Sequence, residues 1–225
     1  MRNYFIYVVV AFAAMFISSC SSDELEPTTT AFGRGTAQAM IGGVKQRVNW
    51  VQLWQDGPKF AEFNVGATAI NEYGGLYAWG GLYNQGDDYY PDCGPLPSNR
   101  DVATQKWGPN WRMPTKDELK DLMNNCTAIW TNNYQGTGKP GQIFTGKGEY
   151  AENSIFLPAA GSYTSYGGFE AVGQDGCYWT SDSKTNLIKY GGINYYQGYA
   201  LLFRTTIKFD DGFPFECLSV RAVLK

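Results

Sequence analysis

The side chains of this chain that could do chemistry are cysteines and carboxylates, because its 225 residues include no histidine. Nucleophile activation by Ser-His-Asp or Cys-His, and every zinc site that needs an imidazole, are therefore excluded. Two carboxylates can hydrolyse a glycoside without histidine. Glu149 with Glu152 is one available pair, and Asp87 with Asp88 is another. Their spacing does not distinguish them from surface charge, so we expect no enzymatic activity and no cofactor.

Cys20 follows a short apolar segment near the start of the chain. Arg2 carries a positive charge, residues 4–17 are almost wholly apolar, and two serines stand directly before Cys20. A run of this length is typical of a secretory signal peptide and is too short to cross a bilayer. A cysteine directly after the cleavage point resembles the lipobox of bacterial lipoproteins. We predict a signal peptide over residues 1–19 and lipidation at Cys20; the alternative is an ordinary secretory signal with an incidental cysteine.

Residues 20–39 lack the apolar period of a helix or strand. Asp23, Glu24 and Glu26 place three carboxylates close behind Cys20, and residues 27–38 are rich in threonine, glycine and alanine. Such a composition buries too little apolar surface to fold, so we predict a tether. The carboxylates either solvate it or direct surface export, because they resemble the export signal of Bacteroidota lipoproteins. We predict a lipid-anchored protein of the outer membrane, exposed on the cell surface.

Four more cysteines follow: Cys93, Cys126, Cys177 and Cys217. None of them forms a C-x-x-C pair, which argues against a zinc site, and we expect no metal. An oxidising compartment favours two disulfides, for which three connectivities exist. We predict that Cys93 pairs with Cys126 and that Cys177 pairs with Cys217. Buried free thiols are the alternative.

Residues 189–199 read Lys-Tyr-Gly-Gly-Ile-Asn-Tyr-Tyr-Gln-Gly-Tyr. This composition is typical of antibody contact loops, in which tyrosine offers broad contact at low entropy cost and glycine and asparagine adapt to the partner. We predict that Tyr190, Asn194, Tyr195 and Tyr196 contact a ligand. The alternative is a glycine-rich hairpin whose tyrosines cover the core.

Other conspicuous side chains are predicted to be structural. Three aspartates at 87, 88 and 92 lack the alternating spacing of a calcium loop, so a solvated loop is expected. Arg112 and Arg221 are expected to make ion pairs or backbone contacts. Of seven tryptophans, we expect all but Trp54 and Trp130 to pack in the core. The five expected core tryptophans are Trp50, Trp79, Trp107, Trp111 and Trp179.

The elements that must position these residues are short strands, long loops and one clear helix. In the helix, Thr115 and Glu118 form a capping box, and Leu119, Leu122 and Met123 follow at the spacing of a buried face. The 16% aromatic content and 27 glycines favour a β-rich domain. Apolar alternation or short apolar runs predict strands within residues 44–54, 59–65, 154–158, 177–180, 199–204 and 218–224.

The length and net charge of the chain limit the number of domains and the classes of partner it can bind. Residues 40–225 are enough for one domain with its own core. A net charge of −3 with no basic run argues against binding to nucleic acid or to an anionic membrane surface. The chain is therefore predicted to be a single α+β domain behind a leader and tether, meeting the membrane through its lipid alone.

Six segments carry a family resemblance. They are Phe-Asn-Val-Gly-Ala-Thr at 63–68, Glu-Tyr-Gly-Gly-Leu-Tyr-Ala-Trp-Gly at 72–80, Trp-Gly-Pro-Asn-Trp-Arg-Met-Pro-Thr at 107–115, Ile-Phe-Leu-Pro-Ala-Ala-Gly at 155–161, Tyr-Trp-Thr-Ser at 178–181 and Ser-Val-Arg-Ala-Val at 219–223. In this order they resemble the Fibrobacter succinogenes major paralogous domain, a family common in Bacteroidota lipoproteins.

The resemblance implies a C-type-lectin-like fold, shared with formylglycine-generating enzymes and with the variable proteins of diversity-generating retroelements. It implies a scaffold for displaying loops, with residues 189–199 in the region that those variable proteins diversify. Cys177 and Cys217 could resemble the reactive cysteine pair of the formylglycine-generating enzymes, but we favour a structural disulfide between neighbouring strands. The expected function is a surface-anchored receptor or adhesin for an extracellular glycan or protein. A structural or assembly lipoprotein is the alternative. A glycan-active or formylglycine-generating-like enzyme is a third and less favoured function.

Overall fold

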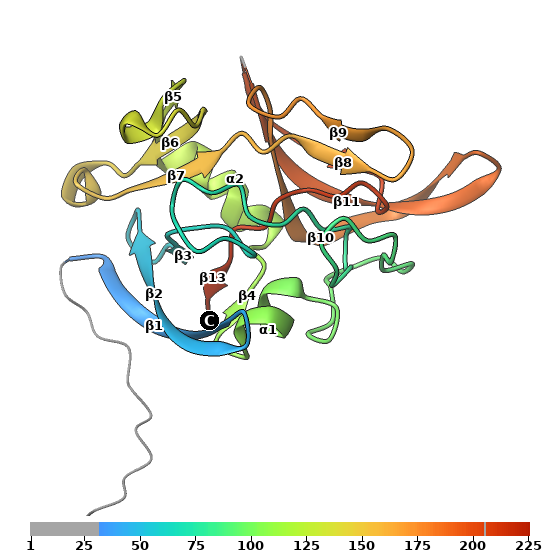
Figure 1. Cartoon of the computed structure of the whole chain (residues 1–225), viewed down its shortest axis with the longest axis horizontal. Coiled ribbons are helices and arrows are strands. Elements are labelled where there is room, and N and C mark those ends of the chain that lie inside the picture. The colour runs from blue at the N-terminus through green and yellow to red at the C-terminus, as the bar shows by residue number, and fades with distance from the viewer. Residues whose placement is uncertain (1–31, 205) are drawn as a thin grey trace, which may run out of the picture.

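The computed structural model describes residues 32–204 and 206–225. The predicted signal peptide, Cys20 and most of the predicted tether lie outside the described residues. The architecture is α+β, as predicted, with mostly antiparallel strands, few helices and long loops (Figure 1).

The largest sheet joins the two ends of the described chain. It has five strands in the order β1-β2-β3-β13-β4, so the last strand of the chain lies between strands from its first half. A Gly42–Gly43 turn with φ of 60° and 82° connects β1 to β2, a backbone conformation that glycine adopts without strain. The strands are β1 (Arg34–Ile41), β2 (Val44–Gln52), β3 (Lys59–Ala61), β4 (Trp111–Arg112) and β13 (Val223–Leu224).

Three smaller sheets complete the β structure. Two of them have three strands each, in the orders β5-β6-β7 and β10-β11-β12, and the third is the hairpin β8-β9. Every pairing between these strands is antiparallel. The strands are β5 (Thr127–Thr131), β6 (Gly141–Thr145), β7 (Ser154–Pro158), β8 (Ser162–Thr164), β9 (Gly168–Glu170), β10 (Gly176–Tyr190), β11 (Ile193–Phe203) and β12 (Ile207–Gly212).

The described residues include two α-helices: α1 (Val102–Trp107), which contacts β1 and β4, and α2 (Lys116–Asn125), which contacts β10 and β11. Helix α2 begins at the predicted capping box, since the Thr115 hydroxyl accepts from the Glu118 N–H and the Glu118 carboxylate accepts from the Thr115 N–H. Leu119 and Leu122 are buried on its inner face, as predicted. Two single turns of 3₁₀ helix, Tyr134–Gly136 and Gly148–Tyr150, lie in the loops that flank β6.

The core confirms the expectations for tryptophan and arginine. The five tryptophans predicted to be internal are buried, whereas Trp54 and Trp130 are half-buried. Arg112 forms an ion pair with Glu118, with Nη2 and Oε1 2.5 Å apart. Arg221 is fully buried and donates to main-chain carbonyls of Ala61, Glu62 and Phe156.

The ordered domain begins before residue 40. Strand β1 covers residues that the composition assigned to the tether, and it pairs with β2 along its whole length, from Arg34 opposite Val51 to Ile41 opposite Val44. Ala37, Ala39 and Ile41 are buried. The buried side chains of β1 are mostly alanines, so the strand shows little of the apolar alternation that predicts a strand. Its hydrogen bonds to β2 order it instead.

Candidate ligand-binding site

The predicted contact segment forms the end of a long β-hairpin rather than a loop. Strands β10 and β11 meet at Gly191–Gly192, whose φ angles of 57° and 86° suit a two-residue turn of the kind that matches the twist of paired strands. Strand β12 pairs with β11 only from Gly198 to Phe203. The hairpin therefore continues as a two-stranded ribbon beyond the third strand, and Figure 1 shows it projecting from the body of the domain.

The structure divides the four predicted contact residues between the two faces of this ribbon. Tyr190 pairs with Ile193, and Ile188 pairs with Tyr195, so Tyr190 and Tyr195 share one face. Lys189 pairs with Asn194, and Leu187 pairs with Tyr196, which puts Asn194 and Tyr196 on the opposite face. Side chains alternate along a strand, so consecutive tyrosines cannot act on one ligand surface.

On the first face, the two tyrosines join three aromatic residues from distant parts of the chain. Tyr190 lies 4.8 Å from Phe213, Tyr195 lies 5.4 Å from Phe215, and Phe213 stacks on Phe215 at 5.1 Å, measured between ring centroids. Tyr89 lies 6.0 Å from Tyr195. We call Tyr89, Tyr190, Tyr195, Phe213 and Phe215 the aromatic cluster.

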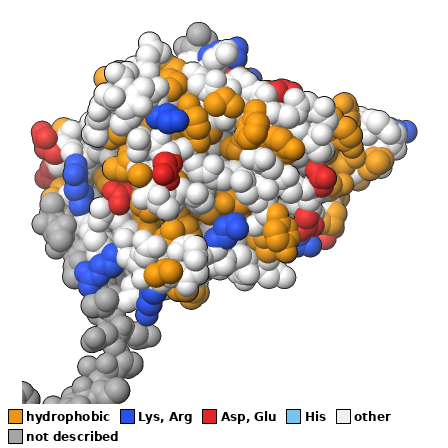
Figure 2. All heavy atoms as spheres, in the orientation of Figure 1, with side chains coloured by type: hydrophobic (Ala, Val, Ile, Leu, Met, Phe, Trp, Pro, Cys, Tyr) orange, Lys and Arg blue, Asp and Glu red, His pale blue; other side chains and the backbone are white. Residues whose placement is uncertain are grey.

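The aromatic cluster lies at the surface, and its member Tyr89 packs against the small core cluster that contains Leu76 and Cys217. Tyr190 and the neighbouring Ile193 are each 57% exposed, and the other members are half-buried. Figure 2 shows hydrophobic side chains over the projecting end of the molecule. Burial, together with the adjacent Tyr195, raises the pKa of Tyr89, so its hydroxyl is protonated at neutral pH. The cluster therefore offers neutral rings and hydroxyl groups to solvent.

A turn after β12 sets the two phenylalanines in place. The Glu216 N–H donates to the Phe213 carbonyl at 2.9 Å, and the Glu216 carboxylate accepts from the Phe213 N–H at 3.2 Å. Burial raises the pKa of Glu216, and the nearby carboxylates of Glu170 and Asp211 raise it further. The sequence prediction included neither phenylalanine; Phe213 directly follows Gly212, the last residue of β12, and Phe215 lies two residues further on.

The opposite face of the ribbon meets the long loop that follows β3. The Gly94 N–H donates to the Ser183 hydroxyl at 2.9 Å, and the Leu96 N–H donates to the Ser181 carbonyl at 2.8 Å. Cys93 on this loop lies beside Tyr196, and its charge raises the pKa of that phenol. Tyr196 therefore lies against this loop on one face of the ribbon, while Tyr195 meets Tyr89 of the same loop on the other face.

The predicted disulfides are absent: Cys93, Cys126, Cys177 and Cys217 are all free thiols. In the first predicted pair, Cys93 is exposed whereas Cys126 is buried in the hydrophobic cluster beneath α2. In the second, Cys177 packs against one hydrophobic cluster and Cys217 lies in another. The loop that carries Cys93 is held to β10 by hydrogen bonds from the Gly94 and Leu96 N–H groups to Ser183 and Ser181. Burial raises the pKa of Cys126 and of Cys177 to about 12, so these thiols stay protonated and unreactive at neutral pH.

The carboxylates of the described residues do not gather into a group that could hold a metal ion. Asp88 of the acidic loop pairs with Arg100 at 2.7 Å. Across residues 32–204 and 206–225, no three cysteine or carboxylate side chains gather closely enough to hold a metal ion. Within the same ranges, no helix is both long enough and apolar enough to span a membrane.

Comparisons of this chain with protein-family models, with curated proteins and with solved structures found no match.

Proposed function

We propose that this chain is a surface-anchored lipoprotein whose C-type-lectin-like domain binds an extracellular glycan or protein through the aromatic cluster. The single observation that carries the proposal is the exposure of Tyr190 and its neighbours at the end of a ribbon that projects beyond its sheet. Exposed aromatic residues held by a rigid scaffold make strong contacts at low entropy cost.

The arrangement of the domain supports a displayed binding surface. The first described residue, Phe32, packs against Tyr150 with tilted rings whose centroids lie 4.9 Å apart, and Figure 1 shows that end of the domain far from the ribbon tip. A tether that enters there leaves the aromatic cluster facing away from the anchor. The short antiparallel strands, few helices and long loops agree with the fold that the family resemblance implies.

Binding is tested by screening glycan and protein arrays with the wild-type domain and matched single variants. Tyr190→Ala and Tyr195→Ala should each weaken binding about 10- to 30-fold, the usual effect of removing a central aromatic contact. Tyr196→Ala, on the opposite face, is the control and should bind like wild type. Equal binding by all three variants would exclude the aromatic cluster. A domain that binds nothing on either array would favour the structural or assembly role.

Anchoring is tested separately in cells. Palmitate labelling should modify the wild-type chain and not a Cys20→Ala variant, and protease added to intact cells should remove the domain. Unlabelled wild-type protein would overturn the lipid anchor, and a domain protected from protease would place it on the periplasmic side.

The family resemblance further leads us to propose that the β10–β11 hairpin is encoded by a diversified region. A reverse transcriptase gene near this one, with a template repeat matching the codons of about residues 178–210, would support diversification. A neighbourhood without either element would overturn it and leave the binding proposal standing.

A further inference from the structure

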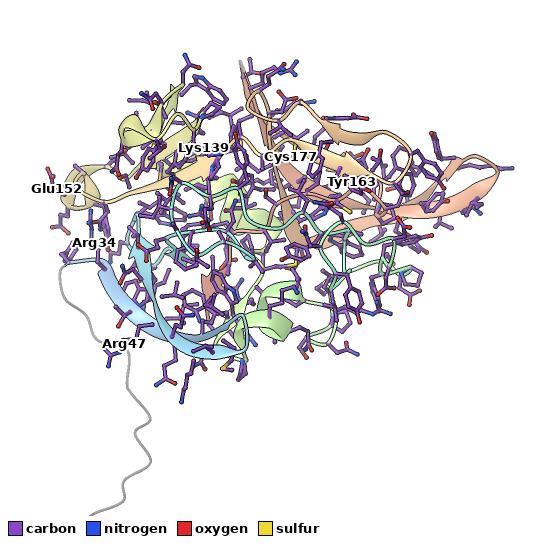
Figure 3. All side chains as sticks on the ribbon, viewed as in Figure 1. Arg34, Arg47, Lys139, Glu152, Tyr163 and Cys177 are labelled. Atoms are coloured by element: carbon purple, nitrogen blue, oxygen red, sulfur yellow. The ribbon has the colours of Figure 1, made fainter. Side chains whose placement is uncertain are left out.

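A second concave surface lies at the other end of the domain from the hairpin tip. One cavity of about 380 Å³ is lined by residues of β1, β2 and β7, and a second of about 350 Å³ lies against the loop of residues 68–71. The two cavities share Glu62, Ile70, Tyr134 and Gln135, so they form one continuous groove. Figure 3 labels Arg34 and Glu152 at this end, and Arg34 lines the first cavity.

The groove is assembled from segments far apart in the sequence. Arg34 comes from β1, Asn49 from β2, Glu62 from the segment after β3, and Tyr134 from the 3₁₀ turn after β5. Arg34 is held in place, since its Nε donates to Asn153 Oδ1 at 2.7 Å. We call this surface the polar groove.

Tyr134 gives the polar groove a fixed aromatic wall. Its ring stacks on Phe156 with centroids 3.9 Å apart and an interplanar angle of 0°, and Phe156 is itself buried in the domain. One face of the tyrosine ring is therefore covered by the core, while the half-buried remainder of the side chain lines both cavities.

Glu62 and Tyr134 line both cavities, and the buried Arg221 guanidinium interacts electrostatically with each of them. Among the described residues, neither the half-buried Glu62 carboxylate nor the Tyr134 hydroxyl makes a hydrogen bond or an ion pair. Burial raises the pKa of Tyr134, the nearby Arg221 guanidinium lowers it, and the negative charge of Glu62 raises it. An uncharged phenol can donate a hydrogen bond and the carboxylate can accept several.

The side chains around this pair favour a hydroxyl-rich ligand. Amide groups of Asn49, Asn71 and Gln135 line the polar groove, and each can donate and accept hydrogen bonds. Sugar rings pair C–H faces, which pack on aromatic rings, with hydroxyls that need both donors and acceptors. The charged side chains that line the polar groove are Arg34 and Glu62, so it offers no net positive charge to a nucleic acid, and a metal ion would need more carboxylates than are present there. The continuity of two cavities suits a chain of sugars.

We propose that the polar groove binds a linear, uncharged oligosaccharide, with one sugar ring against Tyr134 and a sugar hydroxyl donating to the Glu62 carboxylate. This site is independent of the aromatic cluster and of the lipid anchor.

The test is calorimetric titration of the wild-type domain with a panel of uncharged hexasaccharides built from glucose, mannose or N-acetylglucosamine. At least one should bind. Tyr134→Ala should weaken that binding at least 10-fold, and Glu62→Gln about 3- to 10-fold, while Tyr134→Phe, which keeps the stacked ring, should lose less than Tyr134→Ala. Glu149→Gln, the same chemical change at an exposed carboxylate outside the polar groove, should bind like wild type.

The near-ultraviolet circular dichroism of each variant shows whether it is folded. If Tyr134→Ala unfolds, Tyr134→Phe and Glu62→Gln still test whether the polar groove binds the sugar. Failure of every hexasaccharide to bind would overturn the proposal, as would equal affinity for wild type, Tyr134→Phe and Glu62→Gln. Tyr190→Ala should leave hexasaccharide binding unchanged; a loss in that variant would assign the sugar to the aromatic cluster and overturn the assignment to the polar groove.

Discussion

Arg221 shows how a single side chain can join three segments of this fold. It is fully buried, and its guanidinium donates to Asn64 Oδ1 and to the carbonyls of Ala61, Glu62 and Phe156 at 2.7 to 2.9 Å. Burial lowers the pKa of Arg221 to about 10, so the side chain stays charged at neutral pH. Its charge is solvated by carbonyl and amide oxygens, which ties the segment after β3 and strand β7 to the C-terminal segment.

Replacing this arginine should therefore be costly. In Arg221→Met, three buried carbonyls lose their donors, and we expect the free energy of unfolding to fall by about 3–5 kcal/mol. Arg100→Met is the matched control, since Arg100 makes only a surface ion pair with Asp88, and we expect it to lose about 1 kcal/mol or less. Urea denaturation at pH 7 measures both, and equal losses would contradict the role assigned to Arg221.

Glu216 should make the folded protein more stable at low pH than at neutral pH, whereas a salt-bridged carboxylate stabilises a protein at neutral pH. Burial raises its pKa above the ordinary value of 4.5, so the folded protein holds this proton more tightly than the unfolded chain does. The associated stability is fully present below pH 4.5 and declines as pH rises through the raised pKa. Glu216→Gln, which can still accept from the Phe213 N–H, should remove this decline. Melting temperatures of both proteins between pH 4 and 7.5 measure the difference, and parallel curves would argue against the shift.

At the scale of elements, the start of helix α2 depends on one hydroxyl. The Thr115 side chain accepts from the Glu118 N–H, which otherwise has no intrahelical partner. Thr115→Ala should lower the free energy of unfolding by about 1 kcal/mol, whereas Thr115→Ser keeps the oxygen and should stay within a few tenths of a kcal/mol of wild type. Chemical denaturation compares the two, and an equal loss in the serine variant would point to packing of the methyl group instead of capping.

The hairpin turn sets the position of the aromatic cluster. Gly192 has a φ of 86°, which strains any residue with a β-carbon, so Gly192→Ala should destabilise the ribbon by about 1–2 kcal/mol. Gly191→Asn is the control, because asparagine followed by glycine favours this two-residue turn. Amide hydrogen exchange of residues 187–196 should accelerate in the alanine variant alone, and unchanged exchange there would mean that the strands, not the turn, hold the ribbon.

At the scale of the whole molecule, the distribution of thiols reports on how the chain is packed. Cys93 is exposed, Cys177 is half-buried, and Cys126 and Cys217 are buried. In a Cys20→Ser chain prepared without reductant, Cys93 should react with a thiol reagent at once and Cys177 more slowly, whereas the other two should react only after unfolding. Four thiols should titrate in denaturant. Two or fewer would support the disulfides that the sequence favoured.

The two sites differ in how far the sequence could predict them. The tyrosines of residues 189–199 were visible from composition, but their division between two faces follows from the register that places Ile188 opposite Tyr195. Phe213 and Phe215 join them because β12 turns back beside β11. The polar groove was not predicted at all, since Arg34, Glu62 and Tyr134 share no local pattern.

The sequence by itself determined the features that depend on neighbours along the chain or on residue type. These include the absence of histidine chemistry, the capped helix at Thr115, and the burial of most tryptophans. Capping hydrogen bonds span a few residues, and large apolar side chains leave water wherever the chain places them. Only the tertiary structure decided the ordering of β1, the separation of the four cysteines, and the residues that meet in the aromatic cluster and the polar groove. The ordering of β1 depends on its pairing with the neighbouring β2, and the other outcomes depend on contacts between distant segments, which local sequence does not specify.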